Sequence, residues 1–197
     1  MKLTREFYLR SGLELAHDLI GKQLVHHTPE GTTKGIIVEV EAYMGHDDAA
    51  AHAYRSRRTA RTAVQFGEGG FVYLYMIYGQ HLCMNVVANG AEVPESVLIR
   101  ALEPTEGIEL MKRRRKTKLV RTLCNGPGKL TQAMGIEKQH YGVDLCGDLL
   151  YIESIFGPQP PITATKRINV DYSGEAAAYP WRFVYTDHPC ISVPPRH

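Results

Sequence analysis

The chain has 197 residues, of which 44% are hydrophobic and 22% charged, and its 23 basic and 21 acidic side chains give a net charge of +2 at pH 7. This composition excludes intrinsic disorder, and the length predicts one domain that covers residues 1–197. Charges interrupt the N-terminal segment and no long apolar run follows, so we expect no signal peptide, no transmembrane segment and a cytoplasmic location.

The first predicted elements are a helix and a β-hairpin. Ser11 and Glu14 have the spacing of a capping box, and the apolar residues behind them recur at helical spacing, which predicts an amphipathic helix over residues 11–20. Residues 22–27 and 34–43 are β-favouring and flank a run of turn residues. These two segments therefore predict an antiparallel hairpin.

The second strand of this hairpin carries two acids, for which two interpretations are open. Glu39 and Glu41 on an exposed strand face would simply be solvated. Arg100, however, is the single charge of an apolar strand segment over residues 96–102 and needs a carboxylate or an aqueous cleft, which makes Glu41 its candidate partner. Strand alternation predicts Ile36, Val38, Val40 and Ala42 on one face and Glu39, Glu41 and Tyr43 on the other.

A long loop and a second hairpin come next. Residues 44–70 are rich in Gly, His, Asp and Arg and lack aliphatic periodicity, which is typical of a functional loop. Residues 71–89 indicate a hairpin in which Gly79 begins a two-residue type II′ turn, so that Tyr78 lies beside the tip. Its first strand is expected to present Tyr73 and Tyr75 on one face and Leu74 and Met76 on the other.

The second half of the chain contains two basic features. A helix is expected to open at Pro104 and to lead into the basic run at residues 112–118, which is usually a solvated helix face. The turn at residues 125–129 lacks the spacing of a P-loop but precedes a short helix, whose free N–H groups and neighbouring Lys129 suit an anion. Short strands and loops complete a mixed α and β chain.

No metal site is indicated. The four cysteines contain no CxxC pair, which favours free thiols. Neither His46 and His52 nor the adjacent His26 and His27 have the spacing of a ligand pair on one face. Taken alone, His52 is explained equally well as an ordinary loop histidine and as a functional residue.

Four segments resemble one known family in order and spacing: IVEVEAYMGHDDAAAH, FVYLYMIYGQHLCMN, VLIRALEPTEG and NGPGKLTQAMGI. They are similar to the alkyladenine (3-methyladenine) DNA glycosylases, and the likeness runs from about Glu6 to Val193, as in a bacterial-type member. The resemblance implies an α+β fold in a single domain, with a curved, largely antiparallel β-sheet, a protruding β-hairpin and surrounding helices. It also implies a monomer without a cofactor that acts on double-stranded DNA in the bacterial nucleoid.

The implied enzyme is monofunctional: it flips a damaged purine out of the duplex and hydrolyses its N-glycosidic bond. By the resemblance, Glu41 is the general base that activates water, Arg100 helps to hold that water, and Tyr78 fills the gap left in the duplex. The backbone carbonyl of Ile168 is implied to contact the same water. The implied base pocket comprises Tyr43, His52, Tyr75, Asn85 and Ile168, and the expected contacts to the DNA backbone are Arg55, Arg57, Arg58, Arg61 and Lys129.

The sequence departs from the family pattern in the loop beside the pocket. Thr62 and Gln65 stand where members commonly have Asn and Met. We therefore expect this loop to differ from that of other members in how well it is ordered or in the lesion that it prefers. No lysine falls in the pocket motifs, so water is expected as the nucleophile. Two alternatives stay open: a non-catalytic DNA-binding module, which leaves Glu41 and Arg100 unexplained, and a free-nucleoside hydrolase, which needs no tyrosine at a hairpin tip.

Overall fold

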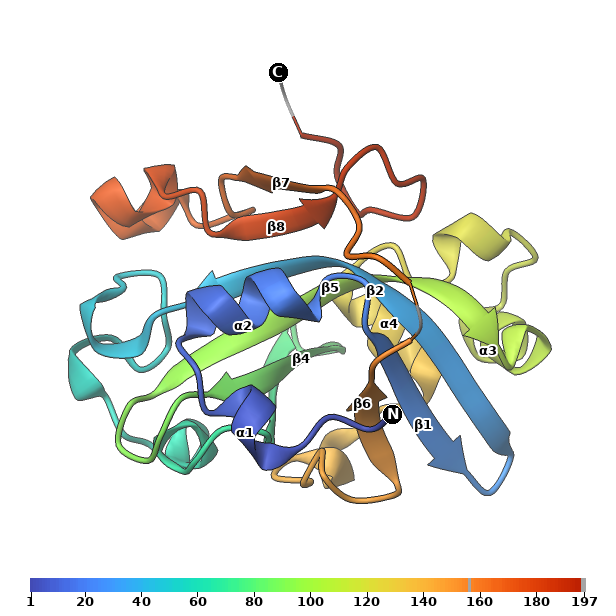
Figure 1. Cartoon of the computed structure of the whole chain (residues 1–197), viewed down its shortest axis with the longest axis horizontal. Coiled ribbons are helices and arrows are strands. Elements are labelled where there is room, and N and C mark those ends of the chain that lie inside the picture. Colours follow the sequence, from blue (N-terminus) through green and yellow to red (C-terminus); the bar gives the residue numbers. More distant parts are fainter. Residues whose placement is uncertain (156, 196–197) are drawn as a thin grey trace.

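The computed structural model describes residues 1–155 and 157–195 and is built around one curved antiparallel sheet (Figure 1). The strands follow the order β3-β4-β5-β2-β1-β6, while β8 pairs with β2 and β7 pairs with β8. The expected α+β fold with a largely antiparallel sheet is therefore confirmed. The strands are β1 (Gln23–Thr28), β2 (Gly31–Tyr43), β3 (Val72–Ile77), β4 (His81–Ala88), β5 (Glu95–Glu106), β6 (Leu150–Glu153), β7 (Ile162–Thr165) and β8 (Arg182–Tyr185).

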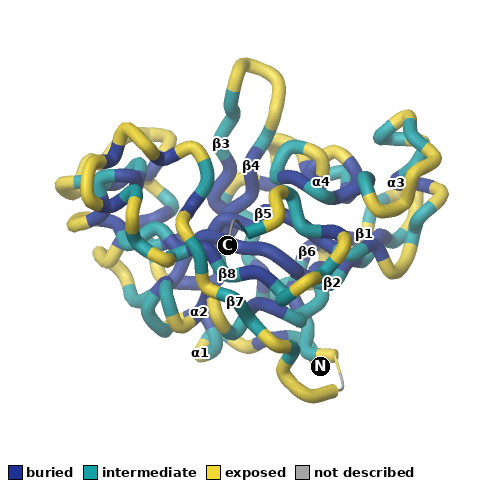
Figure 2. Tube along the Cα trace, turned by 90° about the horizontal axis from the view of Figure 1, so that it is seen from above, coloured by how far each residue is buried: buried dark blue, intermediate teal, exposed yellow. Residues whose placement is uncertain are grey.

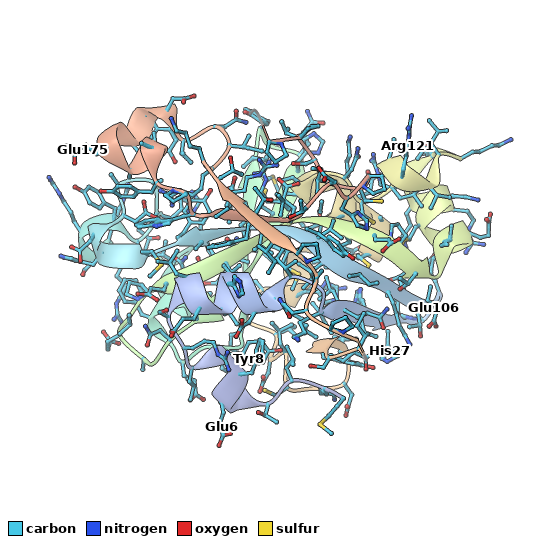
Figure 3. The ribbon with its side chains drawn as sticks, turned by 45° about the horizontal axis from the view of Figure 1, so that its top comes forward. Glu6, Tyr8, His27, Glu106, Arg121 and Glu175 are labelled. Atoms are coloured by element: carbon cyan, nitrogen blue, oxygen red, sulfur yellow. The ribbon has the colours of Figure 1, made fainter. Side chains whose placement is uncertain are left out.

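Four short α-helices and several 3-10 turns surround the sheet, and the turns η4 with Arg121 and η6 with Glu175 lie on opposite sides of the molecule (Figure 3). Among the described residues, no helix has the length and apolar character that crossing a bilayer requires. The helices are α1 (Arg5–Tyr8), α2 (Gly12–Leu19), α3 (Ile108–Arg115) and α4 (Pro127–Met134), and the turns are η1 (Gly45–Asp47), η2 (Tyr54–Ser56), η3 (Ala63–Phe66), η4 (Val120–Thr122), η5 (Lys138–His140) and η6 (Asp171–Ala178).

Local signals placed several elements correctly. The capping box of α2 is present: the Ser11 hydroxyl accepts from the Glu14 N–H at 3.3 Å, and the Glu14 carboxylate accepts from the Ser11 N–H at 3.1 Å. The first hairpin is confirmed as β1 and β2, and the loop at residues 44–70 holds only 3-10 turns. The main core joins α2 and α4 to the sheet, with Leu15, Met84 and Leu130 among its members.

A β-bulge breaks the alternation of side chains along β2. The pairing of β2 with β5 shifts its register on both sides of Glu39. Val40 and Ala42 consequently lie in the main core, whereas Val38 belongs to a second apolar cluster against which Ile36 packs. The prediction that Ile36, Val38, Val40 and Ala42 share one face is therefore wrong, because an extra residue in a strand turns the following side chains to the opposite face.

The β3–β4 hairpin protrudes from the body of the molecule with an exposed tip (Figure 2). Tyr78 and Gly79 both have positive φ, 51° and 72°, and the Gln80 N–H donates to the Ile77 carbonyl at 3.2 Å. Positive φ at both central residues is the pattern of a type I′ turn. The predicted type II′ turn beginning at Gly79 is wrong, because β3 ends at Ile77 and Tyr78 itself is the first left-handed residue.

The helix after β5 begins later than predicted. The prediction that it opens at Pro104 is wrong, because β5 continues to Glu106 and pairs there with Lys34 of β2. The Lys34 ammonium and the Glu106 carboxylate lie 3.0 Å apart across this pair. The helix α3 starts at Ile108, after Gly107 reverses the chain at φ 73°. Long-range strand pairing thus overrides the local start signal.

Candidate active site

The Glu41 carboxylate is fully buried and accepts three hydrogen bonds. They come from the Tyr43 hydroxyl at 2.9 Å, Arg100 Nη1 at 3.3 Å and the Ile168 backbone N–H at 2.7 Å. The expected contact between Glu41 and Arg100 is therefore present. Burial by itself would lower the pKa of Arg100, but the Glu41 and Glu39 carboxylates outweigh it and raise that pKa. A solvated face for the two acids is excluded, since both are 0% exposed.

A hollow of about 600 Å³ lies next to this carboxylate and extends along the β3–β4 hairpin to Tyr78 at its tip. Its volume is in the range of small-molecule sites. The three groups that bond to Glu41 all belong to its lining, so the acid forms a floor one layer beneath it. The predicted site residues that line it are Tyr43, His52, Tyr75, Tyr78, Arg100, Lys129 and Ile168.

Packed aromatic rings form one wall of the hollow. The rings of His52 and Tyr75 meet edge to face, with centroids 4.6 Å apart, and the ring of Tyr73 lies behind them, 5.7 Å from that of Tyr75 and tilted by 30°. His52 Nδ1 shares a hydrogen bond of 2.8 Å with the Tyr73 hydroxyl. Edge-to-face contacts of this kind each contribute about 0.5–1.5 kcal/mol beyond the buried area. The wall is consequently a preformed aromatic surface.

The protonation states keep this wall uncharged. Burial, assisted by Arg61 and Arg57, lowers the pKa of His52 to about 4, so its imidazole is neutral at pH 7. Burial, with Glu41 nearby, raises the pKa of the Tyr43 hydroxyl well above its usual value. Tyr43 therefore remains a hydrogen-bond donor to Glu41.

Asn85 lies one layer deeper than the other predicted pocket residues. It does not line the hollow but a cavity of about 40 Å³ behind the aromatic wall, together with Gln65 and Ser96. The Gln65 amide nitrogen donates to the Ser96 hydroxyl at 3.0 Å, while its oxygen is buried without a partner. Tyr43 and Tyr75 line both spaces, so the cavity adjoins the hollow. Gln65, one of the two residues that depart from the family pattern, thus lies behind the hollow.

The basic residues expected to meet DNA are exposed but not all free. Arg58 pairs with Glu92 and lies over the Phe66 ring at 4.1 Å. Lys129 donates to the Asn125 side-chain oxygen at 2.9 Å, at the start of α4. The exposed side chains are those of Arg55, Arg57, Arg58, Arg61 and Lys129.

Lys129, expected as a contact to the DNA backbone, also lines the hollow. The sequence placed no lysine in the pocket motifs, so this position adds an amine to the site. It enters through the N-terminal end of α4, which contributes Pro127 and Gly128 to the same lining. The pocket motifs did not include this segment, because it joins the site only through tertiary packing.

Sequence reasoning missed two buried ionic contacts around the site. Arg182 donates to Glu39 at 2.8 Å, and its signal was available, since it is a single charge in an apolar strand as Arg100 is. Arg167 pairs with Asp48 at 2.5 and 2.9 Å, and both side chains are 0% exposed. Asp48 and Arg167 are 119 residues apart, both outside the main strands, and no local pattern connects them.

The structure contains no disulfide among its cysteines: Cys83, Cys124, Cys146 and Cys190 are all free. Within residues 1–155 and 157–195, no group of three or more His, Cys, Asp or Glu side chains is placed to hold a metal ion. Burial raises the pKa of the Cys83 thiol, which lines the hollow, to about 11. Cys83 is therefore an uncharged thiol at pH 7.

Comparison with known families shows the family of the chain. A family model described as methylpurine-DNA glycosylase matches residues 6–189. The chain belongs to this family. Relatives named "Putative 3-methyladenine DNA glycosylase" include one from Clostridium acetobutylicum, 48% identical over 201 residues and 98% of each chain. Others are from Alkaliphilus oremlandii, 46% identical over 98% of this chain and 99% of the relative, and Bacillus cereus, 48% identical over the same shares.

Membership of the methylpurine-DNA glycosylase family confirms the family expected from the four sequence segments. The protein is a DNA glycosylase for alkylated bases, with DNA as its substrate. This assignment argues against a DNA-binding module without catalysis and against a hydrolase of free nucleosides.

Proposed function

We propose that this glycosylase flips an alkylated purine out of duplex DNA into the hollow and hydrolyses its N-glycosidic bond with a water molecule activated by Glu41. The observation that carries the proposal is a buried carboxylate held directly beneath an aromatic-walled hollow of about 600 Å³. A base inside a duplex is out of reach of such a site, so it must leave the stack before it reacts.

The wall favours the charge of the damaged base. Alkylation at N3 or N7 gives a purine a positive charge, and the faces of aromatic rings attract cations. Tyr75 and Tyr43 supply such rings, and His52 is neutral at pH 7 and so does not repel the base. Asn85 reaches only those base atoms that enter the smaller cavity.

One carboxylate is sufficient for the reaction. Departure of the base takes the electron pair of the C1′–N9 bond and leaves an oxocarbenium-like sugar. Water attacks C1′ and gives its proton to Glu41, whose negative charge also stabilises the developing positive charge on the sugar. In this scheme Arg100 helps to hold the water, and the Ile168 carbonyl contacts it, while the Ile168 N–H orients Glu41.

The exposed basic residues suit the phosphates that flank the flipped nucleotide. Arginine and lysine contacts to phosphate position the protein without reading sequence. Because Arg58 already pairs with Glu92, it gains less from a phosphate than its neighbours do. The proposed backbone contacts are Arg55, Arg57, Arg58, Arg61 and Lys129.

Tyr78 is proposed to fill the gap that the flipped nucleotide leaves. Tyr78 is 82% exposed at the tip of the protruding hairpin (Figure 2), and an aromatic ring can replace lost stacking. Tyr78→Ala should weaken flipping about tenfold, the stabilisation of one stacking contact. The measurement is the fluorescence change of an ethenoadenine in duplex DNA, with Gln80→Ala at the same tip as the control. Equal flipping by Tyr78→Ala and wild type would remove Tyr78 from this role.

A water nucleophile predicts no covalent intermediate. Borohydride added during turnover should trap no protein–DNA complex, because a Schiff base requires an attacking amine. Lys129 lines the hollow and is the amine to exclude, so Lys129→Gln is tested in parallel. A trapped complex that disappears in Lys129→Gln would assign the attack to the lysine instead of water.

The proposed function is tested by single-turnover excision from duplex oligonucleotides that contain 3-methyladenine, 7-methylguanine, hypoxanthine or ethenoadenine. Release of an alkylated purine with formation of an abasic site supports the proposal. Binding of these duplexes without release, or release from free methylated nucleosides alone, contradicts it.

A further inference from the structure

We propose that Glu39, Arg182 and Ser192 form a positioning cluster that fixes the Arg100 guanidinium beside Glu41. The inference rests on the proposed function, because it explains how the group that holds the water is kept in place. Of the three residues that donate hydrogen bonds to Glu39, Arg100 is the one that lines the hollow and also contacts Glu41, so Glu39 is inferred to act through Arg100.

Glu39 is a buried carboxylate that accepts four hydrogen bonds. Its Oε1 accepts from Arg100 Nε at 2.9 Å, Arg182 Nε at 2.8 Å and the Ser192 hydroxyl at 2.7 Å. Its Oε2 accepts from the Ser192 N–H at 2.5 Å. A carboxylate held by four donors has one fixed orientation and gives its partners the same rigidity.

The Arg100 guanidinium is engaged at all three of its nitrogen atoms. Nε donates to Glu39 at 2.9 Å, Nη1 to Glu41 at 3.3 Å and Nη2 to the Ser192 hydroxyl at 3.4 Å. Because the guanidinium is planar, three such contacts fix both its position and its rotation. The shortest of the three goes to Glu39, so Glu39 is the principal partner of Arg100.

The charges explain why Arg100 is shared between two acids. Glu39 and Glu41 face Arg100 and Arg182, so the two negative and two positive charges of these four buried side chains cancel. Without the charge of Glu39, Arg100 would have Glu41 as its only anionic partner and would be drawn closer to it. A tighter ion pair would occupy the Glu41 oxygen that the water needs. Glu39 therefore keeps Arg100 near Glu41 without letting it cover the acid.

The cluster depends on the fold, since it joins three separate segments of the chain. Glu39 lies at the bulge of β2, Arg182 opens β8, and Ser192 belongs to the C-terminal segment that passes over the sheet (Figure 1). Arg182 also bonds to the Val193 carbonyl in that segment. The bulge aims Glu39 at Arg100, a use that bulges beside active sites commonly have.

The test separates positioning from stability and from the proposed function itself. Glu39→Gln keeps the shape of the side chain and should lower single-turnover excision at least about tenfold, since small misplacements in a site are costly. Ethenoadenine flipping and binding of lesion DNA should change less than about twofold. Glu106→Gln, an exposed acid on β5, is the control. Ser192→Ala removes one donor to Glu39 and carries the test if Glu39→Gln does not fold.

A double-mutant cycle decides whether Glu39 acts through Arg100. In an Arg100→Gln background, Glu39→Gln should lower excision by less than about threefold, because residues that act as a unit are not additive. Full multiplication of the two losses, or binding and excision that fall together, would overturn the positioning role. Glu41→Gln in the same assay shows separately whether the proposed function holds, because an active Glu41→Gln enzyme refutes that function whatever Glu39 does.

Discussion

Glu41→Gln should lower the rate of single-turnover excision at least about a hundredfold, the lower range for loss of a general base. Glutamine has the same shape, and its oxygen can still accept from the Tyr43 hydroxyl or the Ile168 N–H. Its amide cannot take a proton from water and carries no charge to stabilise the sugar. Binding of lesion DNA is therefore expected to stay within a few-fold of wild type.

The measurement is excision from a duplex that holds one alkylated purine, with protein in excess over DNA, beside a binding assay on the same duplex. Glu106→Gln provides the matched control, because that acid is exposed, pairs with Lys34 and does not line the hollow. An excision rate close to wild type in Glu41→Gln would remove Glu41 from the role of general base.

Arg167→Met should lower the free energy of unfolding by about 3–5 kcal/mol, the usual effect of breaking a buried ion pair from one side. Asp48 would be left fully buried without its partner. Arg167 also donates to the Ala42 carbonyl at 3.0 Å and to the Ala176 carbonyl at 3.1 Å. Arg167 thus connects the end of β2, the segment that holds Asp48 and the turn η6.

The loss is measured as the shift of the urea midpoint, together with the melting temperature, which should fall by roughly 10 °C for a chain of this size. Lys166→Met changes the exposed neighbour and serves as the control. Excision should fall as well, because Arg167 precedes Ile168, whose N–H orients Glu41. A loss of less than about 1 kcal/mol would show that the pair is compensated elsewhere.

Local patterns determined several parts of this protein. The capping box at Ser11 and Glu14 depends on residues within one helical turn, and the shared face of Tyr73 and Tyr75 depends on strand alternation alone. The lone charge of Arg100 in an apolar strand was enough to predict an acidic partner, because a buried charge requires one. Each of these patterns involves residues close together in the sequence, so each can be interpreted without knowledge of the fold.

The family resemblance carried the sequence analysis further than residue patterns alone. Four segments in a fixed order predicted the family, which the match over residues 6–189 confirms. They also named the residues that gather at the hollow, with Tyr43 and His52 on its wall. Composition and spacing by themselves would have led only to a nucleic-acid-binding domain.

Tertiary structure alone decided the faces of β2, the partner of Asp48 and the place of Lys129. These features depend on strand register and on contacts between segments far apart in the chain. The bulge at Glu39 reverses the faces of β2, and it follows from pairing with β5 and not from the residues of β2. Asp48 meets Arg167 across 119 residues, and Lys129 reaches the hollow only because α4 packs against the hairpin strand β4. The sequence thus predicted most of the residues that meet at the hollow, while packing decided how deeply each is buried and which charged partners hold it.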